Sequence, residues 1–360
     1  MKTVKTVLKI LLILILAVVL AAAGLVGWLS VTEYKPQAVE TLEPLQSEAE
    51  AVLQEGAVLD ILSWNIGYGG LGKGSDFVMD GGSHVRSADP ETVTKYLTGI
   101  DSLTRGGGYD LVLLQEVDVD SARTYGVNEA ALLSAGTSFQ ALNYSCPWVP
   151  NPSTLIIDPM GRVNSGLLTI SSLRVDRAER QSLPCPFSWP LRAVNLKRCL
   201  LVSYLPIEGS DRQLVLVNLH LEAYDDGEGK LAQTRQLRDF IQSEYEKGNY
   251  VIAGGDFNQV FPGSLEVYPN RHPELWVPGV LDGSLLPEGE GWRYAFDLDA
   301  PSCRLLNQPY NPADTENTQY YVIDGFILSP NVELELAENL GAEDFANSDH
   351  NPVHIRVVLK

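Results

Sequence analysis

The chain has 360 residues, with 46 acidic and 26 basic side chains and a formal net charge of −20. Such a charge repels polyanions and the basic residues form no long cluster, so we expect nucleic acid to be a poor partner. The four cysteines, Cys146, Cys185, Cys199 and Cys303, show no Cys-x-x-Cys spacing, which argues against a cysteine-bound metal cluster. A disulfide between Cys185 and Cys199 and buried free thiols remain alternatives.

Segment 1–32 is expected to be a membrane anchor. Lys2, Lys5 and Lys9 precede an uncharged stretch from Ile10 to Val31, and at about 1.5 Å per helical residue this stretch is long enough to cross a hydrocarbon core of roughly 30 Å. The positive flank predicts that this end stays in the cytoplasm and that the rest of the chain lies outside the cell membrane. Secretion after cleavage of a signal peptide is the alternative, but signal cores usually run for only about 7 to 15 residues.

Residues 33–57 are rich in Glu, Gln, Ala and Leu and lack strand patterning, so we expect a juxtamembrane helix or stalk there. Residues 58–360 are then expected to form one domain. This part of the chain, about 300 residues long, can bury a large core, and the sequence shows neither a second linker nor an internal repeat. We expect this domain to be monomeric.

Short apolar runs recur along the domain and predict β-strands. The runs at 58–66 and 109–117 are apolar almost throughout, which is typical of strands that are buried on both faces. Further strands are expected at 166–171, 194–204, 214–221, 250–253, 321–328 and 354–359.

Two helices are expected between these strands. The first begins with Asp89 as its N-cap and Pro90 at the first helical position, and an apolar stripe at helical spacing runs from Val93 to Ile100. The second spans about 229–246. Strands interspersed with helices indicate two packed sheets flanked by helices.

Polar side chains follow directly on several of the apolar runs. Groups held at the ends of buried strands gain rigidity from the core beneath them, so this recurrence predicts a functional site at the strand ends. The residues in question are Asn65, Glu116, His220, Asp256 with Asn258, and Asp324.

Six short motifs contain these residues and follow one another along the domain. They are Trp64-Asn65, Gln115-Glu116, Asn218-Leu219-His220, Gly254-Gly255-Asp256-Phe257-Asn258, Ile323-Asp324-Gly325 and Asn347-Ser348-Asp349-His350-Asn351-Pro352. In kind and order they resemble the endonuclease/exonuclease/phosphatase superfamily, which includes apurinic endonucleases, deoxyribonucleases, sphingomyelinases and inositol polyphosphate 5-phosphatases. The resemblance implies an α/β fold, a four-layer α/β sandwich in which two packed, mostly antiparallel sheets are flanked by helices.

The resemblance also implies a site for Mg²⁺ or Mn²⁺, which suits the hard oxygens of carboxylates and amides. Glu116 resembles the principal metal-binding glutamate of the superfamily, Asn65 resembles its asparagine partner, and Asp349 would reach the same metal. Glu116 follows directly on Leu113 and Leu114, and a charge at the end of so apolar a run needs a partner.

The remaining motif residues would carry the catalysis. Asp256 and Asn258 resemble the pair that aligns the attacking water and holds a phosphoryl oxygen. His350 would act as the general base or as an imidazolium that contacts the scissile phosphate, with its other ring nitrogen oriented by Asp324. His220 is placed like the superfamily histidine that stabilises the transition state or the leaving group.

Three further features concern the substrate. Asn164 resembles an asparagine on the strand that forms a wall of the superfamily site, so we expect it to bind substrate. Two stretches, 67–88 and 261–292, depart from the superfamily pattern. Long loops beside a site are usually functional, so both are candidates for substrate recognition, with surface elaboration as the alternative.

Together these features predict a membrane-tethered, divalent-metal-dependent phosphoesterase outside the cytoplasm. Its expected reaction is the hydrolysis of a phosphodiester, in a small molecule or a lipid headgroup, by in-line attack of water. A metal-dependent nuclease is an alternative that uses the same residues, although the acidic composition disfavours it. A catalytically inactive binding domain is a second alternative, against which the six intact motifs argue.

Overall fold

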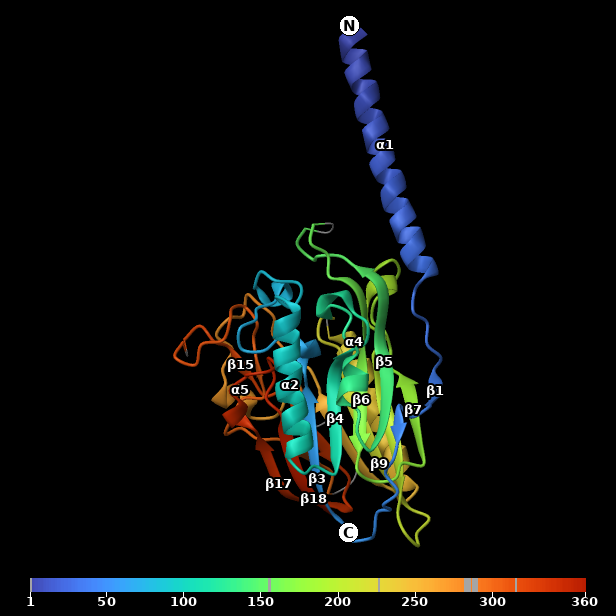
Figure 1. Cartoon of the computed structure of the whole chain (residues 1–360), viewed down its shortest axis with the longest axis vertical. Coiled ribbons are helices and arrows are strands. Elements are labelled where there is room, and N and C mark those ends of the chain that lie inside the picture. The colour runs from blue at the N-terminus through green and yellow to red at the C-terminus, as the bar shows by residue number, and fades with distance from the viewer. Residues whose placement is uncertain (1, 155–156, 226, 282–285, 287–290, 315) are drawn as a thin grey trace.

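The computed structural model describes residues 2–360 except 155–156, 226, 282–285, 287–290 and 315 (Figure 1). The N-terminal helix α1 (Lys2–Val31) stands away from the rest of the chain, which forms one body at its end. By length and composition this helix can cross a membrane, and a signal sequence would pass the same test. Part of the 261–292 loop discussed above lies outside the described residues.

Two seven-stranded sheets make up most of the domain. Neighbouring strands are antiparallel except β9–β10 in one sheet and β3–β4 in the other, which are parallel. The first sheet has the order β1 (Val39–Leu42), β7 (Arg177–Ser182), β8 (Cys199–Pro206), β9 (Gln213–His220), β10 (Tyr250–Asp256), β16 (Asp324–Leu328) and β13 (Arg293–Ala295). The second has the order β17 (Val332–Asn339), β18 (Val353–Leu359), β3 (Val58–Asn65), β4 (Leu111–Asp118), β6 (Gly161–Ser171), β5 (Thr137–Val149) and β2 (Gln46–Ser47).

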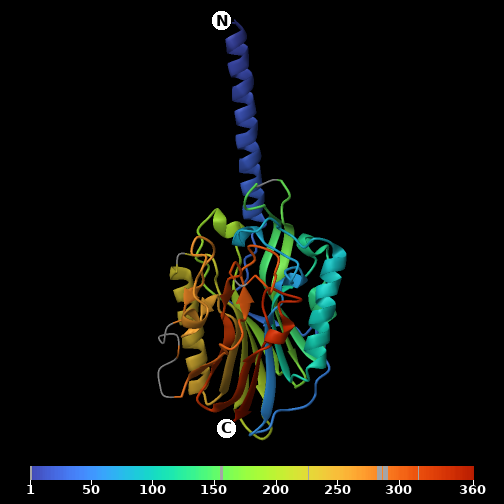
Figure 2. The ribbon, with the colours of Figure 1, turned by 90° about the vertical axis from the view of Figure 1, so that its left-hand side faces the viewer.

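A helix covers the outer face of each sheet, so the domain has four layers (Figure 2). The helix α2 (Pro90–Gly106) packs on the second sheet through Leu97, and α4 (Glu228–Glu246) packs on the first through Leu237. This arrangement confirms the expected four-layer α/β sandwich. Smaller elements are α3 (Glu129–Leu133), α5 (Ser264–Val267) and the two-stranded ribbons β11 (Gln259–Val260) with β12 (Gly279–Val280) and β14 (Cys303–Arg304) with β15 (Tyr320–Tyr321).

Strand β3 shows why the central strands read as continuous apolar runs. Leu59 and Ile61 face the core between the two sheets, whereas Leu62 and Trp64 face the core beneath α2. Side chains alternate along a strand, so both faces of this one are buried. Asn65 falls on the same face as Ile61 and therefore points into the space between the sheets.

A polar bridge joins the two sheets just beneath the ends of their central strands. Gln115 donates from Nε2 to Oδ1 of Asn218 across 2.9 Å, and Asn218 donates to the carbonyl oxygens of Leu114 and Leu168 at 3.1 Å. Both side chains are fully buried. Because a buried amide left without partners costs free energy, this bridge favours one relative placement of the sheets.

Residues 33–57 do not form the expected helix or stalk. Strand β1 pairs with β7 at the edge of the first sheet, and β2 pairs with β5 at the edge of the second. Leu53 is buried in the core between the sheets. These strands are too short for their pattern to stand out in the sequence, and they exist because each completes a sheet edge that the rest of the domain supplies.

Candidate active site

Three neighbouring strands of the first sheet bring three of the predicted residues together. The parallel register of β9 and β10 places His220 beside Asp256, and the antiparallel register of β10 and β16 places Asp324 on the other side of Asp256. Gly255 allows this close spacing, because its φ is +148° and a Cβ there would lie 1.9 Å from the carbonyl oxygen of Leu219. A side chain at this position would force the strand ends apart.

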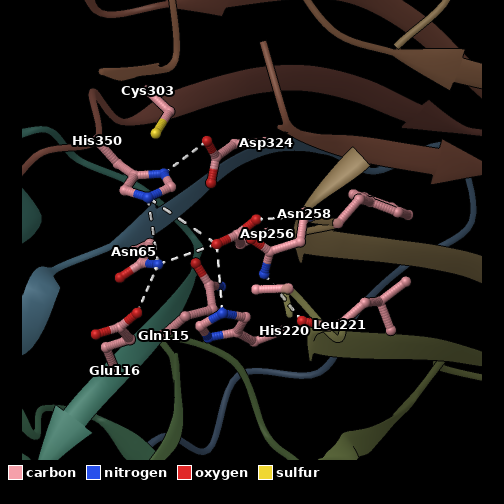
Figure 3. A network of polar contacts seen from close by, with 12 residues as sticks. Asn65, Gln115, Glu116, His220, Leu221, Asp256, Asn258, Cys303, Asp324 and His350 are labelled. Carbon is pink, nitrogen blue, oxygen red and sulfur yellow. Dashed lines mark hydrogen bonds and ion pairs between the residues drawn. The ribbon is translucent and has the colours of Figure 1, made fainter. Parts of the chain in front are cut away.

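The second sheet contributes Asn65 and Glu116 from the ends of β3 and β4. The pairing of β4 with β6 shifts register between Leu114 and Val117, and Glu116 lies in this bulge with a φ of +57°. Bulges re-aim side chains next to active sites. Asn65 donates from Nδ2 to Oε1 of Glu116 at 3.3 Å and to Oδ2 of Asp256 at 3.1 Å, so it connects carboxylates from both sheets (Figure 3).

His350 is held by Asp324, as the sequence predicts. Its Nδ1 lies 2.8 Å from Oδ2 of Asp324 (Figure 3). The same oxygen accepts a hydrogen bond from Ser302 at 2.7 Å. Burial by itself would lower the pKa of His350, but the carboxylate of Asp324 and other anionic neighbours raise it well above its ordinary value. This raised pKa favours the imidazolium form of His350, and its Nε2 points towards Asp256, 4.0 Å away.

The pKa of His220 is shifted in the opposite direction. Its Nε2 lies 3.4 Å from Oδ2 of Asp256, and its Nδ1 has no hydrogen-bond partner among the described residues. Burial lowers the pKa of His220 well below its ordinary value, and the nearby charges of Arg198 and His350 lower it further. The site therefore pairs a neutral imidazole with a charged one on either side of a carboxylate.

The carboxylates of the site provide a donor set that fits a divalent cation. Burial raises the pKa of Asp256 to about 7, with the charge of Asp324 adding to the effect, and burial raises the pKa of Asp349 to about 6. A cation among these crowded oxygens would relieve their repulsion. Two groupings are available: Glu116, Asn65 and Asp349 line one cavity, while ligand atoms of Asp256, Asp324 and His350 lie within 4.8 Å of one another in the described chain.

The two groupings differ in whether their oxygen atoms are already engaged in hydrogen bonds to an imidazole. Asp324 already accepts hydrogen bonds from His350 and Ser302 through one oxygen, so it is committed to orienting the imidazole. Glu116 and Asp349 face the cavity, and among the described residues neither carboxylate is hydrogen-bonded to an imidazole; Oδ2 of Asp349 lies 3.9 Å from Nε2 of His350. The assignment of Asn65, Glu116 and Asp349 as metal ligands therefore stays our prediction.

A cavity of about 380 Å³ opens over these groups. Asp324 and Asn164 are not among its lining residues, and the Asn164 side chain instead accepts a hydrogen bond from Ser145 at 2.8 Å. The buried Asn143 lines the cavity instead. The other predicted residues do line it, namely Asn65, Glu116, His220, Asp256, Asn258, Asp349 and His350.

Arg198 is a cavity residue that the sequence analysis missed. It is only 3% exposed, and its Nε and Nη1 have no hydrogen-bond partner within the described part of the chain. A buried guanidinium without an anion is costly, so this side chain is positioned for an anionic ligand in the cavity. The signal available in the sequence is a charge directly before the apolar run that begins at Cys199.

The two unusual loops also reach the cavity. Loop 67–88 contributes Tyr68, Phe77 and Asp80 to its lining, and loop 261–292 contributes Trp276. The guanidinium of Arg123 stacks on the ring of Tyr68 at 3.6 Å, which fixes one side of the opening. Both loops are therefore more than elaboration of a distant surface.

Comparison with known proteins agrees with this geometry. A model of the endonuclease/exonuclease/phosphatase family matches residues 62–324. The fold resembles an endonuclease/exonuclease/phosphatase from Beutenbergia cavernae DSM 12333, at 16% identity and a TM-score of 0.52 over 84% of this chain and 72% of that one. It also resembles one from Bacteroides vulgatus, at 14% identity and a TM-score of 0.50 over 84% of this chain and 100% of that one.

The human Nocturnin catalytic domain with bound sulfate aligns at 18% identity and a TM-score of 0.48, over 84% of this chain and 95% of that one. A search of curated proteins finds no match. The family model covers most of the chain and includes every strand end from which the site is built except the segment of Asp349 and His350. This chain belongs to the endonuclease/exonuclease/phosphatase family.

Proposed function

We propose that this chain is a divalent-metal-dependent phosphoesterase that hydrolyses a phosphodiester, in a small molecule or a lipid headgroup, by in-line attack of water. Members of its family are generally metal-dependent phosphoester hydrolases. The observation that carries the proposal is the convergence of Asn65, Glu116 and Asp256 with two oppositely protonated imidazoles on one cavity. Phosphoryl transfer needs charge neutralisation and a positioned water, and this set of groups supplies both.

Each side chain has a role that follows from its surroundings. A bound Mg²⁺ or Mn²⁺ would polarise the phosphoryl oxygens. Asp256 would accept a proton from the attacking water, because a general base acts best when its pKa lies near the working pH, and burial raises the pKa of Asp256 to about 7. The Asn258 backbone N–H holds Oδ1 of Asp256 at 2.8 Å, so the reaction would use Oδ2, which accepts a hydrogen bond from Asn65 at 3.1 Å.

The charged and neutral histidines would act on different oxygens. The imidazolium of His350, oriented by Asp324, would contact the scissile phosphate through Nε2. Neutral His220 would stabilise the transition state or the leaving group from the neighbouring strand. Arg198 would add a further positive charge at the non-bridging oxygens.

The charge of the chain supports a small or lipid substrate over a polynucleotide. A nuclease would use the same catalytic residues, but a net charge of −20 works against binding a DNA backbone. We also propose that α1 holds the enzyme in the cell membrane with the catalytic domain outside, because the lysines precede its uncharged part.

The test is a substrate panel with the full-length protein in detergent micelles, with Mg²⁺ and with excess chelator. The panel contains bis(4-nitrophenyl) phosphate, sphingomyelin, phosphatidylinositol phosphates, sugar phosphates and plasmid DNA. We expect metal-dependent hydrolysis of small or lipid esters and a large loss of rate and metal affinity in Glu116→Gln, which should stay folded. The matched control Glu246→Gln lies on α4 and should retain the activity. Full activity in chelator or in Glu116→Gln would refute the metal assignment, and preferred cleavage of plasmid DNA would favour the nuclease.

A further inference from the structure

The end of α1 is fixed to the domain by both apolar and polar contacts. Leu29 is buried in a cluster with Tyr144 and Met160, and Leu25 packs against the same cluster. Trp189 donates from Nε1 to the Ser30 hydroxyl at 2.8 Å. Immediately after the helix, Glu33 accepts a hydrogen bond from Arg192 at 2.9 Å. A segment destined only for cleavage has no need of such contacts, and they set the direction in which α1 leaves the domain.

Exposed apolar side chains lie at the end of the domain where α1 is attached. Trp28 is 46% exposed, Trp189 58%, Leu191 61% and Ile157 69%. Ile157 belongs to the segment between β5 and β6, whose described residues lie at the same end of the domain as the base of α1 (Figures 1 and 2). Tryptophan and neighbouring apolar side chains at the end of a membrane span are typical of residues that sit at the lipid–water interface. We call these four residues the membrane-facing patch.

The same segments form one wall of the active-site cavity. Val149 and Met160 flank the segment that carries Ile157, while Val194 ends the 3₁₀ turn that begins at Leu191, and Leu196 follows it. Six residues belong both to the cluster that holds α1 and to the cavity lining: Phe77, Tyr144, Val149, Met160, Val194 and Leu196. An apolar wall therefore runs from the base of α1 to the catalytic groups at the strand ends.

We propose that this cavity takes the phosphate ester of a membrane lipid directly from the bilayer that holds α1. The lipid phosphate would lie at Asp256, His350 and Arg198, and the first part of its apolar region would lie along the wall shared with the α1 cluster. The membrane-facing patch would dip into the interface and keep the cavity mouth against the lipids. Water adds across one P–O bond, its oxygen going to phosphorus and a proton to the leaving alcohol. This inference rests on the proposed phosphoesterase function.

The first experiment compares lipids with their water-soluble headgroups. Full-length protein is reconstituted in vesicles that contain phosphatidylcholine, phosphatidylethanolamine, phosphatidylglycerol and phosphatidic acid, and Mg²⁺ is added. The deacylated counterparts of these four lipids are supplied in solution at the same bulk concentration, with bis(4-nitrophenyl) phosphate as a soluble reference. We expect at least one lipid to be hydrolysed roughly tenfold faster than its deacylated counterpart, because only the lipid uses the apolar wall.

The second experiment tests the patch with a charge-introducing double variant. Ile157→Asp with Leu191→Asp should lower lipid hydrolysis in vesicles by roughly tenfold and leave hydrolysis of the soluble reference unchanged. The matched control is Leu132→Asp with Leu231→Asp, two exposed apolar residues of α3 and α4 that lie outside the patch and outside both loops at the cavity. This control should alter neither activity.

The outcomes separate the two hypotheses. Hydrolysis of the soluble reference without hydrolysis of any lipid, or equal rates for lipids and deacylated counterparts, would overturn the lipid inference and leave the phosphoesterase proposal standing. Equal loss of lipid hydrolysis in the patch and control variants would overturn the role of the patch. Absence of metal-dependent hydrolysis of every phosphate ester would overturn both the proposed function and this inference.

Discussion

Replacing Asp324 or His350, singly and together, tests whether the two act as one catalytic unit. Their side chains are 1% and 6% exposed, and Nδ1 of His350 lies 2.8 Å from Oδ2 of Asp324. A hydrogen bond to a charged group contributes about 1.5–3 kcal/mol, and about 3 kcal/mol corresponds to roughly a hundredfold in rate. We therefore expect Asp324→Asn to lose on the order of a hundredfold in kcat/KM.

General acid–base groups contribute about 10²- to 10⁴-fold, so His350→Ala should lose at least as much. Once the imidazole is gone the carboxylate has nothing to orient, and the double variant should be within about threefold of His350→Ala alone. The assay is kcat/KM for bis(4-nitrophenyl) phosphate with Mg²⁺, after circular dichroism has confirmed folding. Losses that multiply in the double variant would refute the reasoning.

The chain offers a matched control for this cycle in a second histidine–carboxylate pair. His354 places Nε2 2.8 Å from Oδ1 of Asp60, the same distance as in the catalytic pair. Neither residue lines the cavity. Asp60→Asn should therefore change the free energy of unfolding and leave kcat/KM near that of the wild type, which separates loss of a partly buried histidine–carboxylate pair from loss of catalysis.

Three further outcomes are expected. Arg198→Met should lower kcat/KM by tenfold or more. The free energy of unfolding, measured by urea denaturation, should stay unchanged or rise, because the substitution removes a buried cation whose Nε and Nη1 have no partner in the described chain. Burial raises the pKa of Asp80 from an ordinary 3.8 to about 7, so the folded state keeps a proton that the unfolded chain releases. In excess chelator, which removes bound metal, the free energy of unfolding should therefore fall as the pH rises from about 4 to 7. Asp80→Asn should remove on the order of 1 kcal/mol or more of that fall, and an unchanged pH profile would contradict this. Protease added to intact cells should cut the catalytic domain, whereas protection until lysis would reverse the orientation drawn from the lysines of α1.

The strand ends of the site could be predicted because the central strands are buried on both faces. A run such as Leu113-Leu114 leaves no polar position of its own, so the first charge after it, Glu116, is conspicuous in the sequence. The helix α2 was equally visible, since Asp89 accepts a hydrogen bond from the Thr92 backbone N–H at 2.6 Å and caps it as expected. Such local signals depend little on the rest of the fold.

Other elements depend on tertiary context that the sequence does not display. In β7 the buried side chains are Ala178 and Arg180, so no apolar alternation marks the strand. Arg180 is buried because its guanidinium donates to the carbonyl oxygens of Leu142 and Lys197 at 2.8 Å. A buried arginine of this kind is explained only once those carbonyls have been placed beside it.

Asn164, which we expected to bind substrate, lies outside the cavity lining for a geometric reason. Side chains alternate along a strand, and Ser165 faces the cavity, so its neighbour Asn164 faces away. Asn143 reaches the cavity from β5, whose pairing with β6 shifts register between Leu142 and Tyr144. A one-residue bulge thus decides which asparagine lines the cavity, and motif spacing cannot reveal it.

The strands that follow α1 define where the enzyme can be detached from its helix. Because β1 and β2 complete both sheet edges, the only part of the chain between helix and sheets is the short connection from Val31 to Val39. A protease that cuts there would leave a domain whose edges remain paired, which is shed once the contacts of Leu29 and Ser30 are lost, whereas a cut after β2 would bare the edges of β7 and β5 to other chains. Shedding would also separate chemistry from location: the freed enzyme would keep its catalytic groups but would no longer be held against the bilayer.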